Sequence, residues 1–501
     1  MSALRRGALA LMLALLPLVQ SCGENSSTAP RTDPKVATTL ELSTSAVRLT
    51  AIGDTATVKA IVKDQFGAVL SGVSVSWSSS NSGVAKVQGG LVSAIANGVA
   101  SLTATSGSLS ASASITVTQD EARFPEPAPG QMVISLQNQT GGVWPDSLIY
   151  IAVLGRDPQT QRFNWLNADG QLVEAQIADN DAPGHLTKDG INYANYFMTL
   201  DRVRFLKFPK MDSGRLFISL GNPMYIKILQ DGGGNVGFAG PNLANASDPN
   251  INLLFEWVEF TFNDFGFFGN TTQVDQFGFP VTMELIAEGG AFRKKVGITE
   301  SRESIFSAFR SETPAEFRHL VRTGASGDLR IVAPGKGGFE PGGAYADYFA
   351  PYVDSIWTMY ETQSATFSMW NGSRTFTGTV VGDTLRFEEQ GVPNVFYYIR
   401  RKPTTIEILE GSGVLASGNG TELAIQAQIC AAFNRHVMDD PSKWTQPAKY
   451  YTAAPSNYFA AFWHRHSLDG LAYGFAYDDV SEQSTLVQRQ NPRFLTLGVR
   501  W

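Results

Sequence analysis

Two acidic residues of this chain, Glu259 and Asp275, stand among aromatic, glycine and short polar residues. They belong to the stretch FEWVEFTFNDFGFFGNTTQVDQFGFP, Phe255 to Pro280, which contains no lysine or arginine. Proximity of two carboxylates and apolar surroundings both raise the pKa of a carboxyl, so that one of a pair can hold a proton near neutral pH while the other stays ionised. Such a pair can act as general acid and general base.

Alternation along this stretch predicts two antiparallel strands joined as a hairpin. Side chains of a strand alternate between its faces, so Glu259 and Thr261 share one face of the first strand. The glycines of DFGFFGN, residues 264–270, indicate the hairpin loop. With the loop centred near Phe267, Glu259 faces Asp275 on the neighbouring strand.

Two carboxyl groups that flank a sugar linkage are the apparatus of glycoside hydrolysis, in which one protonates the leaving oxygen and the other activates water or attacks carbon. Sugars also bind to aromatic rings and to neutral hydrogen-bonding side chains. The stretch supplies both kinds, and the candidate substrate contacts are Trp257, Phe268, Thr261, Asn263 and Thr272. The pattern alone leaves catalysis open, because most acidic residues are solvated surface groups.

The composition of the whole chain is typical of a β-rich protein with a neutral ligand. Its 501 residues include 48 Gly, 31 Phe, 15 Tyr and 9 Trp, and only 17% are charged, which favours strands joined by tight turns. A formal net charge of −7 and the lack of lysine and arginine clusters argue against nucleic acid or an anionic membrane surface as the main partner. No metal or organic cofactor is implied.

Residues 1–22 are predicted to be an export signal. Arg5 and Arg6 precede an apolar stretch, residues 8–19, that is too short to span a bilayer. The ending VQSC at Cys22 resembles a bacterial lipoprotein box, which implies cleavage and lipidation at Cys22 and leaves residues 23–36 as a flexible tether. The alternative is ordinary secretion with a coincidental cysteine.

Residues 37–118 alternate Val, Thr, Ser and Ala in short runs broken by turn residues, which predicts a small β-sandwich. DQFGAVLSGVSVSWSSSNSGVAKV and GLVSAIANGVASLTAT resemble a bacterial immunoglobulin-like domain of group two, a kind of module that usually serves as a spacer or adhesive unit. Residues 119–130 contain three prolines and four charges, the composition of a stiff linker.

Residues 131–501 form a second unit, large enough to hold the function. From about 131 to 290 the alternation indicates a β-barrel or sandwich, and from about 291 to 470 helical spacing alternates with strands, which indicates a mixed α/β part. The segment AYGFAYDDV, residues 472–480, is expected to return to a strand. A cleft between the two parts is the expected ligand site.

The stretch FEWVEFTFNDFGFFGNTTQVDQFGFPV resembles the signature of glycoside hydrolase family 64, the endo-β-1,3-glucanases of the laminaripentaose-producing type. Further matching motifs are YFAPYVDSIWTMY, FTGTVVGDTLRF, ELAIQAQICAAFNRHVM and NYFAAFWHRHSLDGLAYGFAYDDVSEQS. The resemblance covers the chain from about residue 131 to its end. It implies a thaumatin-like β-barrel and a mixed α/β part that flank a wide groove for glucan.

The resemblance also implies an inverting mechanism, with Glu259 as the general acid and Asp275 as the water-activating general base. Thr261, Asn263 and Thr272 fall on positions expected to contact sugar. Inversion requires roughly 6.5 to 9.5 Å between the carboxyl groups, whereas directly opposed strand residues would lie nearer the roughly 5 Å of a retaining enzyme. The predicted hairpin register and the implied mechanism therefore disagree.

Two histidines and two aspartates near the end of the chain are candidates for a metal site or a catalytic triad. His464 and His466 form an HxH pair whose rings point to different faces of a helix, and neither HExxH nor GxSxG accompanies them. A structural or groove-lining role is favoured for both histidines. The roles of Asp478 and Asp479 are left open.

We therefore expect an exported endo-β-1,3-glucanase, anchored by lipid at the bacterial cell surface or outer membrane or released from it. It would act as a monomer on β-1,3-glucan such as curdlan, laminarin or a fungal wall. The alternative is a non-catalytic β-glucan-binding surface lipoprotein on the same scaffold. The sequence leaves open the product length, the endo or exo preference, the membrane and the ligand of the immunoglobulin-like domain.

Overall fold

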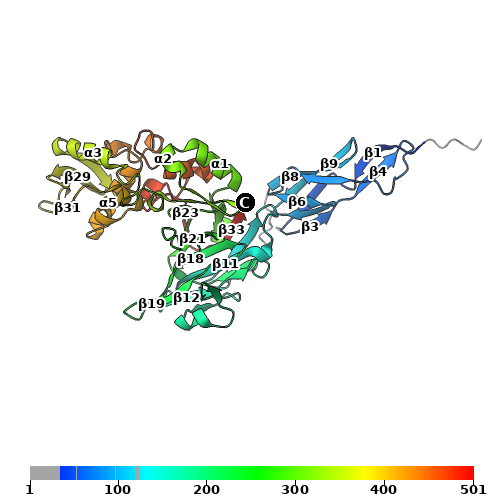
Figure 1. Ribbon diagram of the computed structural model, residues 1–501, viewed down its shortest axis with the longest axis horizontal. Coiled ribbons are helices and arrows are strands. Elements are labelled where there is room, and N and C mark those ends of the chain that lie inside the picture. The colour runs from blue at the N-terminus through cyan, green and yellow to red at the C-terminus, as the bar shows by residue number, and fades with distance from the viewer. Residues whose placement is uncertain (1–33, 52, 96–97, 119–123) are drawn as a thin grey trace, which may run out of the picture.

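The computed structural model describes residues 34–51, 53–95, 98–118 and 124–501. A small strand-rich unit extends from one side of a larger body, in which helices gather at one end and strands at the other (Figure 1). The predicted export signal and the lipidation site at Cys22 lie outside the described residues. None of the helices in the described ranges is long and apolar enough to cross a bilayer.

The small unit is built from two facing sheets and a short β1–β4 pair. Its strands are β1 (Ala37–Leu42), β2 (Ala46–Leu49), β3 (Thr55–Thr57), β4 (Ala60–Asp64), β5 (Ser76–Ser79), β6 (Ala85–Gln88), β7 (Leu91–Ala94), β8 (Gly98–Ser106) and β9 (Leu109–Val117). One sheet has the order β2-β9-β8-β5 and the other β3-β7-β6. Alternate residues such as Val92, Leu102 and Ile115 are buried between them. The immunoglobulin-like identity of this unit stays a prediction.

Part of the predicted linker is docked on the larger unit. Phe124 is buried, and its ring lies 5.3 Å from that of Phe205 and 4.9 Å from that of Phe494. The Glu126 carboxylate pairs with Arg493 at 2.5 Å. The described end of the linker, from residue 124, is therefore held against the following unit.

Two sheets of the larger unit pack face to face as a sandwich. The five-stranded sheet has the order β17 (Phe205–Phe208), β10 (Met132–Gln139), β33 (Pro492–Arg500), β24 (Val281–Ala287), β25 (Phe292–Gly297). The eight-stranded sheet comprises β13 (Leu172–Glu174), β12 (Phe163–Leu166), β11 (Ile149–Arg156), β18 (Met211–Leu220), β21 (Leu254–Asn263), β22 (Gly266–Thr271) and β32 (Val487–Arg489), with β16 (Met198–Thr199) beside β11. The last strand, β33, pairs in parallel with the first, β10, so the end of the chain closes the sandwich.

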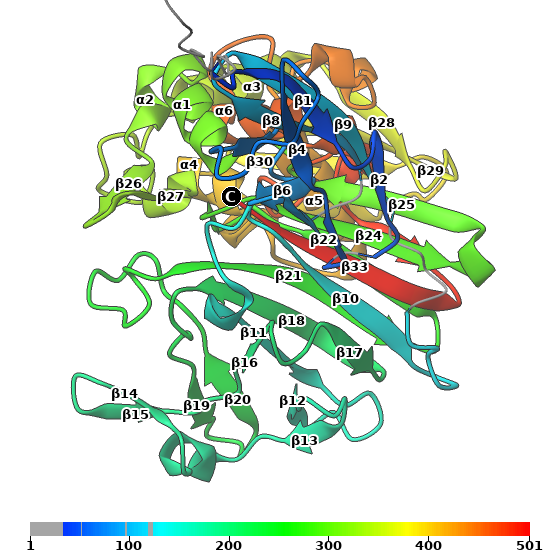
Figure 2. The same cartoon turned by 90° about the vertical axis from the view of Figure 1, so that its right-hand side faces the viewer.

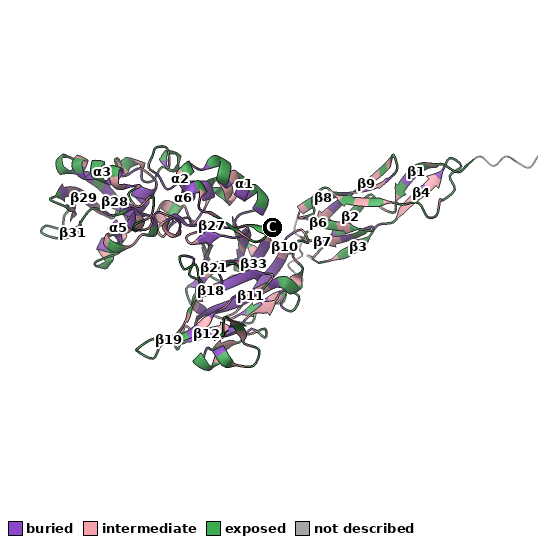
Figure 3. Cartoon of the chain, in the orientation of Figure 1, coloured by how far each residue is buried: buried purple, intermediate pink, exposed green. Residues whose placement is uncertain are grey.

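The eight-stranded sheet is covered on both faces over part of its length. Residues such as Ile151, Leu216 and Val258 face the sandwich core, and Figure 3 shows buried residues running along β11, β18 and β21. A second core lies on the opposite face, between Phe217 and Trp257 of the sheet and residues of the covering layer. That layer includes the hairpins β14 (Leu186–Lys188) with β15 (Ile191–Tyr193) and β19 (Lys227–Gln230) with β20 (Val236–Ala239).

The remaining part mixes helices and short sheets around its own aromatic core, as predicted from periodicity. Its helices are α1 (Arg302–Glu312), α2 (Ala315–Arg318), α3 (Ala350–Thr362), α4 (Thr405–Glu410), α5 (Gly420–Asn434) and α6 (Tyr458–His466). Its strands are β23 (Gln276–Phe277), β26 (Val321–Gly324), β27 (Gly327–Val332), β28 (Ala365–Met369), β29 (Arg374–Val381), β30 (Thr384–Glu389) and β31 (Phe396–Ile399). Side-chain caps start several helices: Ser301 for α1, Asn419 for α5 and Asn457 for α6.

Helices α1, α2 and α3 lie on one side of the sandwich, and the β14–β15 and β19–β20 hairpins lie on the other (Figure 2). The strand predicted for residues 472–480 is absent: this described segment consists of turns and irregular backbone. The reason is that Asp478 is fully buried and bonds the Gly474 N–H, which curls the segment into a turn.

Candidate active site

The predicted hairpin is present, but its register differs from the prediction. Strands β21 and β22 pair so that Glu259 lies opposite Asn270, not Asp275, and the turn is the two residues Asp264 and Phe265. The glycines of this stretch belong to β22 itself. Gly266 has φ +120°, and a Cβ there would lie 2.4 Å from the Arg489 carbonyl oxygen, so glycine is required by the close approach of β32.

The predicted face alternation of β21 is confirmed. Val258, Phe260 and Phe262 enter the sandwich core, whereas Phe255 and Trp257 enter the second core on the opposite face. Glu259, two residues beyond Trp257, lies on the same face as Trp257 but lines a cavity instead of a core.

The sequence predicts Trp257 as a substrate contact, and this prediction is wrong. Its side chain is only 5% exposed and packs with Phe255 in the second core. The Arg215 guanidinium lies over the ring at 5.6 Å from its centroid. A ring covered in this way offers no face to a ligand in an open groove.

A cavity of about 390 Å³ lies on the uncovered stretch of this sheet face. It brings together three predicted site residues, Glu259, Thr261 and Phe268. The other lining residues come from β18, β21, β22 and the segment before β32, and they are Ser213, Gly214, Arg215, Phe260, Asn270 and Leu486. The Thr261 hydroxyl accepts a hydrogen bond from the Ser213 N–H at 3.2 Å, which fixes its position at the cavity wall.

Glu259 is paired with a cation that the local sequence did not reveal. Arg215, opposite it on β18, donates from Nε at 3.0 Å and from Nη2 at 2.7 Å, and both contacts converge on Oε1. Within the described ranges no hydrogen bond reaches Oε2. The side chain of Glu259 is 36% exposed, so the pair lies at the cavity wall and is not sealed in the core.

Asp275 also has a cationic partner. Its Oδ1 pairs with Nζ of Lys336, at the end of the 3-10 turn Pro334–Lys336, and its carbonyl accepts the Ala333 N–H at 3.0 Å. In the described structure Oδ2 has no hydrogen-bond partner, and the side chain is 34% exposed. The expectation that both carboxylates stand unpaired is therefore wrong, because partners distant in sequence fold against them.

Asp275 does not line the cavity of Glu259; it lies where the chain passes from the sandwich to the α/β part. Strand β23, immediately after it, pairs with β27. The segment from Gln273 lies against residue Tyr473, whose carbonyl accepts the Gln273 N–H at 2.9 Å. Burial raises the pKa of Tyr473, and the negative charges of Asp479 and Glu259 add to this increase. Tyr473 therefore lies near both Glu259 and the segment that leads to Asp275.

A buried polar cluster fixes the backbone after Asp275. Arg330 donates to the Gln276 side chain at 2.7 Å, and Arg302 donates to the Gly278 carbonyl at 2.6 Å. The Gly278 N–H donates in turn to Oε1 of Glu256. Burial raises the pKa of Glu256 to about 8, against the lowering effects of backbone hydrogen bonds and the two arginines. Neutral Glu256 is therefore part of the buried polar cluster that fixes the backbone next to Asp275.

Residues 470–480 are tied down by a second buried network. His464 Nε2 lies 3.1 Å from both carboxylate oxygens of Asp478, and its Nδ1 lies 2.8 Å from the Gly470 carbonyl. Arg435 donates to the same carboxylate at 3.1 Å. His466 faces elsewhere, toward Glu300 and Glu312. The two histidines therefore point in different directions, as predicted, and their structural or groove-lining role stays a prediction.

A third carboxylate, Glu410 at the end of α4, lies near Asp275. Burial raises the pKa of Glu410, Lys336 counteracts the increase and the charge of Asp275 adds to it. Lys336 therefore lies within the field of both carboxylates. No local motif marks Glu410, Lys336 or Arg215, because each reaches the site from an element distant in sequence.

Two predicted sugar contacts lie outside the cavity that holds Glu259. Asn263 lines an adjacent cavity of about 520 Å³ and donates to Asp212 at 3.1 Å. Thr272 is buried, and its hydroxyl accepts the Val274 N–H at 3.2 Å, so it shapes the turn that leads to Asp275. Sugar contacts by these two residues stay predictions.

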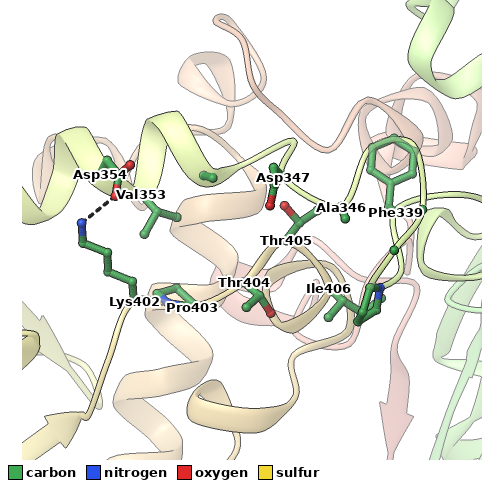
Figure 4. Close-up of a pocket in the computed structure, with 14 residues that line it drawn as sticks. Phe339, Ala346, Asp347, Val353, Asp354, Lys402, Pro403, Thr404, Thr405 and Ile406 are labelled. Carbon is green, nitrogen blue, oxygen red and sulfur yellow. Dashed lines mark hydrogen bonds and ion pairs between the residues drawn. The ribbon is translucent and has the colours of Figure 1, made fainter.

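The α/β part contains a separate cavity of about 570 Å³ between the first turns of α3 and α4 (Figure 4). Asp354 at one end is neutralised by Lys402, whose Nζ lies 2.6 Å away. This leaves Asp347 as the remaining carboxylate of that lining. In the described part of the chain, no group of three or more His, Cys, Asp or Glu residues could hold a metal ion.

Two carboxylates, each held through one oxygen, are the groups that a glycoside hydrolase site needs. Glu259 lies on an open stretch of sheet with an aromatic and neutral lining, and Asp275 lies outside that cavity, where the chain passes to the α/β part. The chain belongs to glycoside hydrolase family 64: the family model described as "Beta-1,3-glucanase" matches residues 130–499.

Solved structures agree with this family. A β-1,3-glucanase domain from Clostridium beijerinckii is 41% identical and superposes with a TM-score of 0.72 over 75% of this chain and 100% of its own. The laminaripentaose-producing β-1,3-glucanase of Paenibacillus barengoltzii, complexed with laminarihexaose, is 31% identical with a TM-score of 0.62 over 91% of this chain and 96% of its own.

A curated relative, the glucan endo-1,3-beta-glucosidase of Arthrobacter sp. (strain YCWD3), is 30% identical over 296 residues, which is 58% of this chain. The match spans only about half of that relative, 52% of its length.

Proposed function

We propose that this protein hydrolyses β-1,3-glucan internally, with Glu259 as the general acid and Asp275 as the general base of an inverting reaction. The observation that carries the proposal is the cavity that places Glu259 with Thr261 and Phe268 on an uncovered sheet face of a family 64 chain. The relative from Paenibacillus barengoltzii that was complexed with laminarihexaose supports the same class of substrate.

The ion pairs fix one oxygen of each carboxylate. Arg215 holds Glu259 through Oε1, and Oε2, which has no hydrogen-bond partner in the described ranges, is the oxygen that would face the leaving oxygen. Lys336 holds Asp275 through Oδ1, with Oδ2 available to take a proton from water. The observed register removes the direct opposition of Glu259 and Asp275 that would have favoured a retaining separation, because Asn270 is the residue opposite Glu259.

Hydrolysis of curdlan by wild type, Glu259→Gln and Asp275→Asn tests the proposal, with release of reducing ends as the measurement. Each substitution removes a proton-transfer group but keeps the side-chain shape, so activity should fall by roughly 10²- to 10⁴-fold. Asp354→Asn is the matched control, since Asp354 belongs to the separate cavity, and it should retain activity.

Two outcomes contradict the proposal. Equal activity of all four proteins would remove the catalytic roles of Glu259 and Asp275. Binding of wild type to curdlan without any release of sugar would favour the alternative, a β-glucan-binding surface protein.

The cellular setting is part of the proposal. Lipidation at Cys22 and a spacer formed by residues 37–118 would hold the catalytic unit away from the membrane, where it can reach an insoluble polymer. Replacement of Cys22 by serine should move the protein from the membrane fraction to the soluble fraction. Unchanged membrane association would contradict the lipid anchor.

A further inference from the structure

The cavity of Glu259 continues toward the tip of the β21–β22 hairpin. A neighbouring cavity of about 340 Å³ is lined by Phe265, Phe268, Glu288, Gln488, Arg489 and Gln490. Phe268 borders both cavities, so the two are neighbours at this residue.

Strand alternation places the neutral lining of both cavities in one row. Phe268 pairs with Gln488 across β22 and β32, and directly opposed residues project from the same face of a sheet. Leu486, directly before β32, lines the first cavity, and Gln490, directly after β32, lines the second. The row from Leu486 to Gln490 spans roughly 13 Å, which is longer than a single sugar ring.

The side chains of this second cavity suit a neutral polyhydroxyl ligand. Phe265, in the two-residue turn, is 74% exposed and presents a free aromatic face. The amides of Gln488 and Gln490 make no hydrogen bond to the described part of the protein, so their donors and acceptors are available. The two charged residues of the lining, Glu288 and Arg489, neutralise each other at 2.9 Å.

We propose that Phe265, Gln488 and Gln490 form a distal subsite that binds a sugar several units away from the cleaved bond and selects for long β-1,3-glucan chains. The inference rests on the proposed function, because the cavity of Glu259 supplies the point of cleavage. A pyranose ring would place its apolar face on Phe265 and its hydroxyls against the two amides. Short oligosaccharides that occupy only the cavity of Glu259 would not reach this subsite.

The test measures kcat and KM of the complete protein on laminari-oligosaccharides of increasing length. For Phe265→Ala, the ratio of kcat/KM on long chains to kcat/KM on short chains should fall about tenfold, through KM, because part of one aromatic face is lost from the contact. Phe265→Trp should restore the ratio. Phe66→Ala is the matched control, since Phe66 is similarly exposed, at 69%, on the small N-terminal unit.

An unchanged ratio in Phe265→Ala, or an equal loss at every chain length, would overturn the subsite. Binding of the oligosaccharides to Glu259→Gln and to Glu259→Gln with Phe265→Ala separates this inference from the proposed function. A length-dependent loss of affinity in the double variant supports the subsite even where wild type fails to hydrolyse. Equal affinities of the two proteins contradict it even where wild type is active.

Discussion

Each carboxylate of the candidate site is held by a cation through one oxygen and leaves the second oxygen free. This arrangement fixes the direction of Glu259 and Asp275 without enclosing either. An exposed or half-exposed ion pair contributes little to stability, so the main consequence of Arg215 and Lys336 is geometric. At the scale of single residues, the orientation of Glu259 and Asp275 is thus set by partners distant in the sequence.

Glu410 provides a residue-scale prediction, because its raised pKa makes it a rival for the proton-donating role. Glu410→Gln should lower kcat by less than tenfold, since Glu410 acts on the charge balance of Asp275 and Lys336 and not on the reacting atoms. Steady-state kinetics on laminarin, beside Glu259→Gln, gives the comparison. A loss as large as that of Glu259→Gln would transfer the acid role to Glu410.

Glu256 gives a second prediction at this scale. Its pKa is about 8 in the folded protein against an ordinary value of 4.5, so between these pH values the folded state holds a proton that the unfolded state has lost. Stability should therefore fall as pH rises from about 4.5 to about 8. Glu256→Gln keeps an acceptor for Gly278 and should remove this part of the slope, as thermal unfolding across this pH range would show. An identical slope in both proteins would contradict neutral Glu256.

At the scale of elements, the β21–β22 hairpin lines the cavity of Glu259, and the segment 470–480 lies near Glu259 at Tyr473. A two-residue turn and the close approach of β32 at Gly266 set the register of the hairpin. The segment 470–480 has no regular structure and depends on Asp478 and its partners His464 and Arg435. Loss of that network should therefore make the segment 470–480, which contains Tyr473, less rigid.

The His464–Asp478 pair predicts a pH-dependent stability. Burial opposes both charges, yet the pair and its neighbours raise the pKa of His464 above 6.5 and lower the pKa of Asp478 below 3.8. The stabilisation by His464 is thus fully present below pH 6.5 and is lost as pH rises through its folded pKa. That of Asp478 is present above pH 3.8 and is lost as pH falls through its own folded pKa.

His464→Gln should lower the free energy of unfolding by about 2 kcal/mol near pH 6, where both groups are charged, and by less in alkaline solution. Chemical denaturation at several pH values measures the difference. His466→Gln is the control on the same helix, and its surface pairs with Glu300 and Glu312 should contribute less than about 1 kcal/mol. A His464 effect that does not vary with pH would contradict the charged pair.

At the scale of the whole molecule, the two ends of the catalytic unit are joined. Strand β33 pairs with β10, and one face of the same sheet receives Phe124 from the predicted linker. The described end of the predicted linker, from residue 124, is therefore part of a hydrophobic cluster of the larger unit.

Phe124→Ala in the complete protein should lower the free energy of unfolding of the catalytic unit by about 3 kcal/mol, because a buried ring is removed from between Phe205 and Phe494. Urea unfolding followed by tryptophan fluorescence measures it. Phe66→Ala, at an exposed ring, should change stability by less than about 0.5 kcal/mol. Equal small effects would mean that the linker is not held against the sandwich.

The sequence by itself determined the features that depend on local periodicity: the alternating faces of β21, the existence of the hairpin and the helices of the α/β part. Distinctive motifs also identified the family and pointed to Glu259, Thr261 and Phe268, which the fold brings together. Only the tertiary structure decided the register of the hairpin, the burial of Trp257 and the cations Arg215 and Lys336. The physical reason is that face alternation follows from the backbone of one strand, whereas register, cover and charge partners depend on segments distant in the sequence, such as β32 against Gly266.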